Sequence, residues 1–255
     1  MKPILELNNI SYSYHTLDGE TKALSDISFS LAPGEFTAVV GPSGCGKSTL
    51  LSLIAGLMKP ESGSMELNGK PLTENSSKIG YMLQHDHLFE WRNVYRNVLL
   101  GAEITNTLTP EVKERASTLL EQYGLKRFAK SRPSELSGGM RQRAALIRTL
   151  LLDPELLLLD EPFSALDYQT RLTVSDDIGQ IIRRSGKTAL LVTHDLSEAV
   201  SLSDRVIILS KRPASIVRII PIIFTLDKDT PLNRRNAPEF KNYFNEIWKE
   251  LNRDE

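Results

Sequence analysis

The hydrophobic positions of this chain gather in short runs that are separated by longer polar or helical stretches. Residues 35–40 form an apolar, β-branched run before a glycine, and residues 47–57 after it have helical spacing. Three further compact apolar runs occupy residues 156–159, 188–193 and 205–209. Alternation of this kind predicts parallel strands joined by crossover helices, and so an α/β fold.

The segments between these runs predict one hairpin and one amphipathic helix. Asn68 and Gly69 end a strand-like stretch and are a strong signal for a tight hairpin turn. Thr109 can cap a helix whose first residue is Pro110, and Gly124 can end that helix. The apolar residues of this helix share one face: Val112, Ala116, Leu119, Leu120 and Tyr123.

The tail from about residue 231 has an apolar pattern of its own. Its large apolar residues are spaced like one face of a helix: Phe240, Tyr243, Phe244, Ile247, Trp248 and Leu251. We predict a C-terminal helix that packs on the body of the protein, in preference to a helix that binds a partner.

Composition narrows the class of protein. With 255 residues, of which 40% are hydrophobic, the chain can form one large domain or a core domain with an inserted subdomain. Its 31 basic and 32 acidic side chains nearly cancel, which disfavours a nucleic-acid partner. A single cysteine excludes an intramolecular disulfide framework and fits a reducing compartment. No stretch approaches the roughly 20 apolar residues of a membrane span, and the start lacks the apolar core of a secretory signal.

The stretch after the first apolar run matches the phosphate-binding loop, which reads glycine, four residues, glycine, lysine, then serine or threonine. It lies between a strand and a helix, where amides at the helix N-terminus attract phosphate. Lys47 would reach the β- and γ-phosphates of a nucleotide, and Ser48 would ligate Mg²⁺. A reactive thiol at Cys45 is the alternative to the favoured role of a small loop residue. The predicted nucleotide-binding residues are Gly41, Pro42, Ser43, Gly44, Cys45, Gly46, Lys47, Ser48 and Thr49.

Two carboxylates follow the apolar run at residues 156–159. A buried strand that leads into Asp160 and Glu161 is costly unless a cation or a proton-accepting role compensates. Asp160 would hold Mg²⁺, usually through water, and Glu161 would polarise the attacking water. Together with the phosphate loop, this pair suits many nucleotide hydrolases, including small-molecule kinases and GTPases.

A third motif separates these classes. Residues 136–143, Leu-Ser-Gly-Gly-Met-Arg-Gln-Arg, resemble the signature sequence of ATP-binding-cassette (ABC) proteins, and the resemblance spans nearly the whole chain. Ser137 and the amides of Gly138 and Gly139, at a helix N-terminus, would form a second anion site suited to the γ-phosphate of an ATP held by another subunit. Met140 stands where the family most often has glutamine, and we expect it to alter fine tuning without loss of activity.

The resemblance assigns roles to further residues one by one. Gln84 resembles the family glutamine that senses Mg²⁺ and the attacking water, and His194 resembles the switch histidine that contacts the γ-phosphate. Asp167 ends a loop that resembles the one across which two subunits communicate. Tyr14, in preference to Tyr12, resembles the aromatic residue that stacks on adenine. The implied catalytic residues are Glu161, His194 and Gln84, and the implied metal site comprises Ser48, Gln84 and Asp160.

The resemblance also implies the architecture, which is a P-loop NTPase core with a mixed sheet, an antiparallel β piece and an inserted α-helical subdomain. The expected parts of this single ABC ATPase domain (1–255) are the core (1–84 and 137–230), the helical subdomain (85–136) and a C-terminal helix (231–255). In this family the subdomain receives a coupling helix from a membrane subunit. Residues 87–94 carry large apolar groups that are either local core or a docking groove, and the groove is favoured.

The implied function is hydrolysis of ATP, with Mg²⁺, by a homodimer bound peripherally at the cytoplasmic face of the inner (plasma) membrane. Separate permease subunits would carry the transported molecule, and an extracytoplasmic binding protein would deliver it. Residues 88–101 and 192–213 are similar to bacterial importers for nitrate, sulfonates, taurine and thiamine-precursor pyrimidines. The alternatives are an exporter ATPase and a non-transport ABC ATPase of DNA repair or translation, which ordinarily shows tandem cassettes, a coiled-coil insertion or a basic face.

Overall fold

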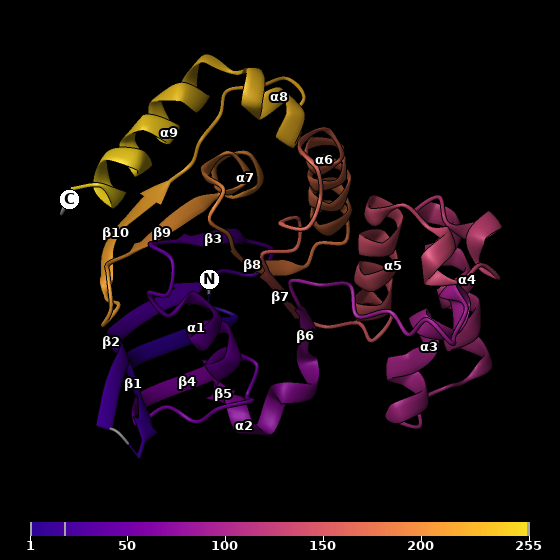
Figure 1. Cartoon of the computed structure of the whole chain (residues 1–255), viewed down its shortest axis with the longest axis horizontal. Helices are drawn as coiled ribbons and strands as arrows, with labels where there is room; N and C mark the ends of the chain where they lie inside the picture. Colours follow the sequence, from indigo (N-terminus) through magenta and orange to yellow (C-terminus); the bar gives the residue numbers. More distant parts are fainter. Residues whose placement is uncertain (1, 18, 254–255) are drawn as a thin grey trace.

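The computed structural model describes residues 2–17 and 19–253, and its strands form two sheets (Figure 1). The larger sheet has six strands in the order β10-β9-β3-β8-β7-β6, and all its neighbours are parallel except β10 and β9. Its strands are β3 (Phe36–Val40), β6 (Ile79–Met82), β7 (Leu156–Asp160), β8 (Thr188–Val192), β9 (Arg205–Leu209) and β10 (Ile216–Pro221). The smaller sheet is antiparallel, in the order β2-β1-β4-β5. Its strands are β1 (Leu5–Thr16), β2 (Gly19–Leu31), β4 (Ser62–Leu67) and β5 (Lys70–Pro71).

The described helices connect the strands of the larger sheet or follow them. The α-helices are α1 (Lys47–Ile54), α2 (Leu72–Asn75), α3 (Val94–Ile104), α4 (Pro110–Gln122), α5 (Gly138–Leu150), α6 (Tyr168–Arg184), α7 (Leu196–Leu202), α8 (Pro231–Asn236) and α9 (Pro238–Leu251). Short 3₁₀ helices occupy Ser76–Lys78, Lys126–Phe128 and Pro133–Glu135. Within the described part of the chain, no helix has the length and apolar character that crossing a membrane demands. The α/β class predicted from the alternation of apolar runs is confirmed.

The two faces of the parallel strands pack against different layers. Side chains alternate along a strand, so Leu156 and Leu158 join one cluster, with α1 and the antiparallel sheet, whereas Leu157 and Leu159 join another, with α5 and α6. Figure 1 shows α1 and the antiparallel sheet on one side of these strands, and α6, α7 and α9 on the other. Any group at the start of α1 is therefore separated by the sheet from α5 and α6.

The structure has the turn and the helix ends at the positions that local sequence signals predict. Asn68 and Gly69 have φ values of 56° and 70°, as a two-residue hairpin turn between β4 and β5 requires. The Thr109 side chain accepts a hydrogen bond from the Val112 amide, so it caps α4. Gly124 has a φ of 73°, the left-handed conformation that ends many helices. The hairpin and the α4 helix are confirmed.

The described part of the C-terminal tail forms two helices where one was predicted over 231–255, so that prediction is wrong; residues 254 and 255 lie outside the described residues. Ala237, between α8 and α9, has an extended ψ of 145°, because the ring of Pro238 disfavours a helical conformation in the residue before it. The predicted packing on the body is confirmed for five of the six apolar residues and is wrong for Trp248, which is 56% exposed. The residues of α9 that pack on the cluster formed by β3, β9 and α7 are Phe240, Tyr243, Phe244, Ile247 and Leu251.

Helices α3 and α4 form a lobe beside the larger sheet, which we call the α3–α4 lobe, and α5 lies between this lobe and the sheet (Figure 1). Helix α5 packs on both parts of the molecule, because Ala144 and Ile147 join the cluster of α3 and α4, whereas Ala145 and Leu146 join the cluster of α6 and the strands. The expected boundary between residues 136 and 137 thus falls at the start of a helix that belongs to both parts.

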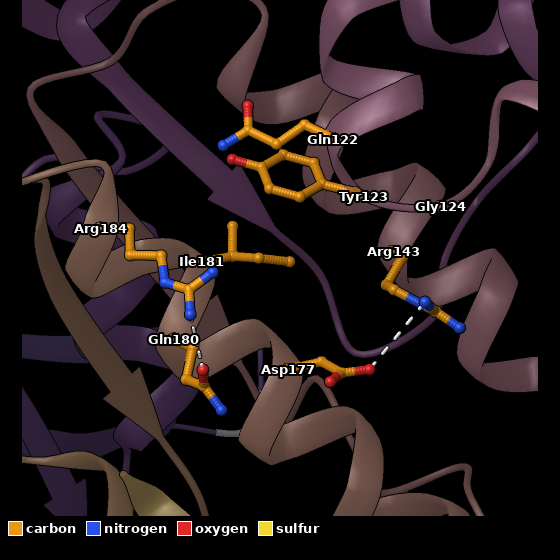
Figure 2. Close-up of a pocket in the computed structure, with 8 residues that line it drawn as sticks. All are labelled: Gln122, Tyr123, Gly124, Arg143, Asp177, Gln180, Ile181 and Arg184. Carbon is orange, nitrogen blue, oxygen red and sulfur yellow. Dashed lines mark hydrogen bonds and ion pairs between the residues drawn. The ribbon is translucent and has the colours of Figure 1, made fainter. Parts of the chain in front are cut away.

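A hollow of about 310 Å³ lies beside α5, where the end of α4 faces α6, and we call it the seam (Figure 2). Tyr123 packs against the clusters on both sides of it. Arg143 and Asp177 approach each other across it with a nitrogen–oxygen distance of 3.9 Å. The residues that line the seam are Gln122, Tyr123, Gly124, Arg143, Asp177, Gln180, Ile181 and Arg184.

Candidate active site

The phosphate loop runs from the end of β3 into α1, as the sequence predicts. Gly44 and Gly46 have positive φ values of 71° and 124°, which favour glycine. A Cβ atom on Gly46 would also lie 2.9 Å from the Leu24 side chain. The Lys47 ammonium donates hydrogen bonds to the carbonyl oxygens of Gly41 (2.8 Å) and Pro42 (3.0 Å). The loop is therefore wrapped around a nearly buried lysine.

Asp160, at the end of β7, meets the start of α1. Its carboxylate accepts hydrogen bonds from the Ser48 hydroxyl (3.3 Å) and from the Tyr81 hydroxyl (3.2 Å). Burial raises the pKa of Asp160, and burial together with the nearby Asp160 raises the pKa of Tyr81 to about 12. Tyr81 therefore keeps its proton at neutral pH and donates a hydrogen bond to the carboxylate. Sequence analysis did not single out Tyr81, which reaches this site only because β6 pairs with β7.

The donor set at Asp160 fits Mg²⁺ held together with a nucleotide. Among residues 2–17 and 19–253, no group of three or more His, Cys, Asp or Glu side chains could hold a metal. Mg²⁺ in nucleotide sites commonly takes one or two protein oxygens and completes its shell with water and phosphate oxygens. The adjacent oxygens of Ser48 and Asp160 match that pattern.

Glu161 lies next to His194. The Nδ1 atom of His194 is 3.0 Å from Glu161 Oε2. The Glu161 backbone has a positive φ of 45°, and its amide donates to the Val192 carbonyl at the end of β8 (2.8 Å). Gln84 donates from Nε2 to the Ser164 hydroxyl (3.2 Å), which in turn donates to the Glu161 carbonyl (3.0 Å). Three loops that follow neighbouring strands thus converge on Glu161.

The phosphate loop, Gln84, Asp160 and Glu161 line one hollow of about 350 Å³. The residues that line it are Ser43, Gly44, Gly46, Lys47, Ser48, Thr49, Gln84, Asp160, Glu161 and Arg212. Arg212 donates a hydrogen bond to the Gly44 carbonyl (2.8 Å) and brings a cation that the phosphate-loop pattern does not contain. Its approach depends on the loop between β9 and β10, so no local sequence signal could have placed it there.

The structure distinguishes Tyr14 from Tyr12, and it also distinguishes the two roles considered for Cys45. The Tyr14 hydroxyl lies 2.9 Å from Thr49 Oγ1, beside the phosphate loop, and the Tyr14 side chain is exposed. Tyr12 packs on the core instead and meets Tyr14 edge to face. Cys45 is only 1% exposed and belongs to the core cluster, which favours the small loop residue over a reactive thiol.

The signature motif lies outside this hollow. Ser137 caps α5 by accepting from the Met140 amide (3.4 Å), and Cβ atoms on Gly138 and Gly139 would lie 2.8 and 2.5 Å from side chains of α6 and the loop before it. Asp167 caps α6, and its hydrogen bonds with Thr170 lower its pKa. Because α5 and α1 pack on opposite faces of the sheet, one chain does not bring the signature motif to its own phosphate loop.

Comparison with known proteins agrees with this geometry. The profile of the family described as "ABC transporter" matches residues 24–164. The chain therefore belongs to the ABC transporter family, and it is an ABC-type ATPase, the subunit of a transporter that binds and hydrolyses ATP. The fold and the recognition made from the signature motif are confirmed.

Its relatives include proteins of nearly equal length. It is 46% identical to "Uncharacterized ABC transporter ATP-binding protein YtlC" of Bacillus subtilis (strain 168), over 97% of this chain and 95% of that protein. It is 40% identical to "Nitrate import ATP-binding protein NrtD" of Synechocystis sp., over 95% of this chain and 93% of the other. It is 41% identical to "Aliphatic sulfonates import ATP-binding protein SsuB" of Bacillus subtilis (strain 168), over 91% of this chain and 88% of the other.

Solved structures resemble it as well. The dimeric post-hydrolysis state of the ATP-binding cassette MJ0796, bound to ADP and Pi, has a TM-score of 0.73 at 29% identity and covers 87% of this chain and 100% of its own. The cbiO1 protein of Clostridium perfringens, part of the ABC transporter complex cbiONQ, has a TM-score of 0.75 at 27% identity, with 87% of this chain and 89% of its own covered.

Proposed function

We propose that this chain energises the uptake of a small molecule or oxyanion, as one of two ATPase subunits that bind a separate membrane permease. The nitrate and aliphatic sulfonate import proteins among its relatives support import and this class of substrate. Taurine, the named substrate of another relative at 38% identity, combines a sulfonate with an ammonium group and belongs to the same class.

The observation that carries the proposal is the separation of two anion sites within one chain. Lys47 and Glu161 share a hollow on one side, whereas Ser137 heads α5 on the other side of the sheet. A second copy in antiparallel orientation would bring its Ser137 to the γ-phosphate that Lys47 holds, and the dimeric cassette with ADP and Pi supports this arrangement.

Hydrolysis then follows from the positions of these side chains. Lys47 would neutralise the β- and γ-phosphates, and Ser48 and Asp160 would hold Mg²⁺, which supplies charge stabilisation to the phosphates when bound. Glu161 would accept the proton of the attacking water through its carboxylate, 3.0 Å from His194 Nδ1. His194 would orient Glu161 and contact the γ-phosphate, and Tyr14 would stack on adenine from the C-terminal end of β1.

Permease docking is proposed for the exposed part of residues 87–94. Leu88 and Val94 are buried in the α3–α4 cluster, so they are local core. Phe89 and Trp91 stack with ring centroids 4.5 Å apart, and Trp91 is 75% exposed. An apolar stack of this kind, placed just after Gln84 in the chain, would bind a short membrane-subunit helix and transmit the state of the nucleotide to it.

The test is dimer formation by the full-length protein. Glu161→Gln removes the proton acceptor and keeps the shape, so the variant should bind ATP without hydrolysing it and elute as a dimer in size-exclusion chromatography. Adding Ser137→Arg to this variant should abolish the dimer while ATP binding persists. A monomer at saturating ATP, also when detergent-solubilised permease is present, would contradict the proposal.

A second measurement addresses the partner. The tagged wild-type protein, purified from membranes of its native cells, should carry an integral membrane protein, and Trp91→Ala should release it without altering basal ATP hydrolysis. Recovery of ribosomes or DNA in place of a membrane protein would favour a non-transport ATPase.

A further inference from the structure

Arg171, on α6, lies behind the two loops that carry Glu161 and His194, and the proposed chemistry leaves it without a role. Its guanidinium donates one hydrogen bond to the Leu166 carbonyl (3.1 Å) and another to Asp195 Oδ2 (3.4 Å). The Arg171 side chain is largely buried, and its Nε has no partner among the described residues. Two contacts therefore define the position of the guanidinium.

The two acceptors belong to different loops. Leu166 directly precedes Asp167 in the loop after β7, which resembles the family loop across which two subunits communicate. Asp195 directly follows His194 after β8 and uses its other carboxylate oxygen to accept from the Ser197 amide (2.7 Å) at the start of α7. Asp195 is thus anchored to α7 on one side and to Arg171 on the other.

These contacts form a closed ring. At the front, His194 Nδ1 lies 3.0 Å from Glu161 Oε2. At the back, Arg171 connects the residue after His194 to the loop that begins at Glu161. A displacement of either loop must stretch the front contact, the back contact or both, so the back contact limits how far His194 can move from Glu161.

An arginine suits this position for a physical reason. Its planar guanidinium presents several donors in a fixed fork, so one side chain can hold a carboxylate and a carbonyl at a set separation. A lysine ammonium is a compact charge on a flexible stem and cannot reproduce that separation. The geometry, taken with the roles proposed for Glu161 and His194, leads to an inference about Arg171.

We propose that Arg171 is a positioning residue for ATP hydrolysis. It holds the loop after β7, which carries Glu161, next to the loop after β8, which carries His194, and so sets the distance between His194 and Glu161. The inference rests on the proposed function. Arg171 touches neither the phosphate loop nor Tyr14, so it should act on the chemical step and leave ATP binding alone.

The test measures kcat and KM for ATP on the full-length protein. Arg171→Met should lower kcat about tenfold, a loss expected when a catalytic group is held less well, and KM should stay within about twofold. Arg171→Lys retains the charge beside Asp195 and should recover part of the rate. If Arg171→Met does not fold, Arg171→Lys keeps the measurement possible, with an expected kcat loss of about threefold.

The chain offers a matched control on the same helix. Arg183 also bridges a carboxylate and a backbone carbonyl, Asp204 Oδ1 at 2.9 Å and the Leu202 carbonyl at 2.8 Å, and its exposure is similar, 28% against 23%. It joins no loop of the active site. Arg183→Met should lower the melting temperature about as much as Arg171→Met and leave kcat within about twofold.

A double-mutant cycle separates the inference from the proposed function. If Arg171 acts through His194, Arg171→Met should change kcat by less than about twofold when His194 is already alanine. Equal losses in both backgrounds, or a KM that rises while kcat is unchanged, would overturn the positioning role and leave the roles of Glu161 and His194 intact. Unchanged kcat in both Glu161→Gln and His194→Ala would instead reject the proposed function.

Discussion

The hollow of the active site and the seam between α4 and α6 are similar in volume, but their polar side chains are held at different distances. Around the active site, hydrogen bonds of 2.8–3.3 Å hold Lys47 and Ser48 at the start of α1 and Asp160 and Glu161 at the end of β7. At the seam, the ion pair of Arg143 with Asp177 has a separation of 3.9 Å (Figure 2).

This difference indicates which part of the molecule is rigid and which part can adjust. Phosphate chemistry needs groups that are already in place, because reorganisation costs free energy at the moment of reaction. The seam joins the α3–α4 lobe to the core, and a loose, half-exposed ion pair contributes little free energy to holding it. We therefore expect large effects from changes at the active site and small ones at the seam, apart from the apolar contact of Tyr123.

The largest expected effect is at the phosphate loop. Lys47→Ala removes a buried ammonium that two loop carbonyls hold in place, and it should lower the rate of ATP hydrolysis by about 10³-fold. Steady-state phosphate release measures the change. Lys78→Ala, an exposed lysine paired with Glu155, serves as the control and should leave the rate unaltered. A loss of less than tenfold for Lys47→Ala would break the comparison.

The second-largest expected effect is a pH dependence of stability that comes from Glu198, on α7 just after the loop that carries His194. Burial first, and then the charge of Asp195, raise the pKa of Glu198 to about 7, although Thr193 donates a hydrogen bond that opposes the shift. The folded state thus keeps this proton where the unfolded state loses it, so stability contributed by Glu198 is present below pH 4.5 and lost as pH rises to about 7.

Replacing Glu198 removes this titration. Glu198→Gln should therefore gain stability relative to the wild type as pH rises from 4.5 to 7, by roughly 3 kcal/mol at most. Urea unfolding at a series of pH values gives the difference. A difference between the two proteins that stays constant across this range would show that Glu198 does not hold its proton in the folded state.

A smaller effect is expected from the apolar contact at the seam. Tyr123 packs against the clusters of both the lobe and the core, so Tyr123→Ala should cost about 2 kcal/mol of unfolding free energy. It should also raise amide hydrogen exchange in α6, on the core side of the seam. Tyr95, which packs on the lobe cluster alone, is the control, and Tyr95→Ala should leave exchange in α6 unchanged.

The smallest expected effect is at the ion pair of the seam. Asp177→Asn should change the unfolding free energy by no more than about 0.5 kcal/mol, because the pair is long and partly exposed. Glu103→Gln breaks a shorter, less exposed ion pair with Arg92 inside the α3–α4 lobe and should cost more. Chemical denaturation compares the two variants. A cost above about 2 kcal/mol for Asp177→Asn would mean that the seam is fixed like the active site.

Local patterns in the sequence predicted the elements whose signals lie within a few residues. The phosphate loop, the Asn68-Gly69 turn and the Thr109 cap all depend on backbone conformations that particular residues favour. The long strands β1 and β2 and the edge strand β10 were not predicted. Their mixed polarity reflects one exposed face, and irregular pairing of β1 with β2 breaks the simple alternation that marks a strand.

The sequence by itself determined the class of the protein, the fold and the candidate chemical groups, because their signals are short motifs with fixed spacing. Only the tertiary structure brought Tyr81 to Asp160 and Arg212 to the phosphate loop, and placed Arg171 behind His194. Each of these contacts joins residues far apart in the chain, and each depends on which strands are neighbours in the sheet. Strand order is a property of the folded chain as a whole, so no local pattern contains it.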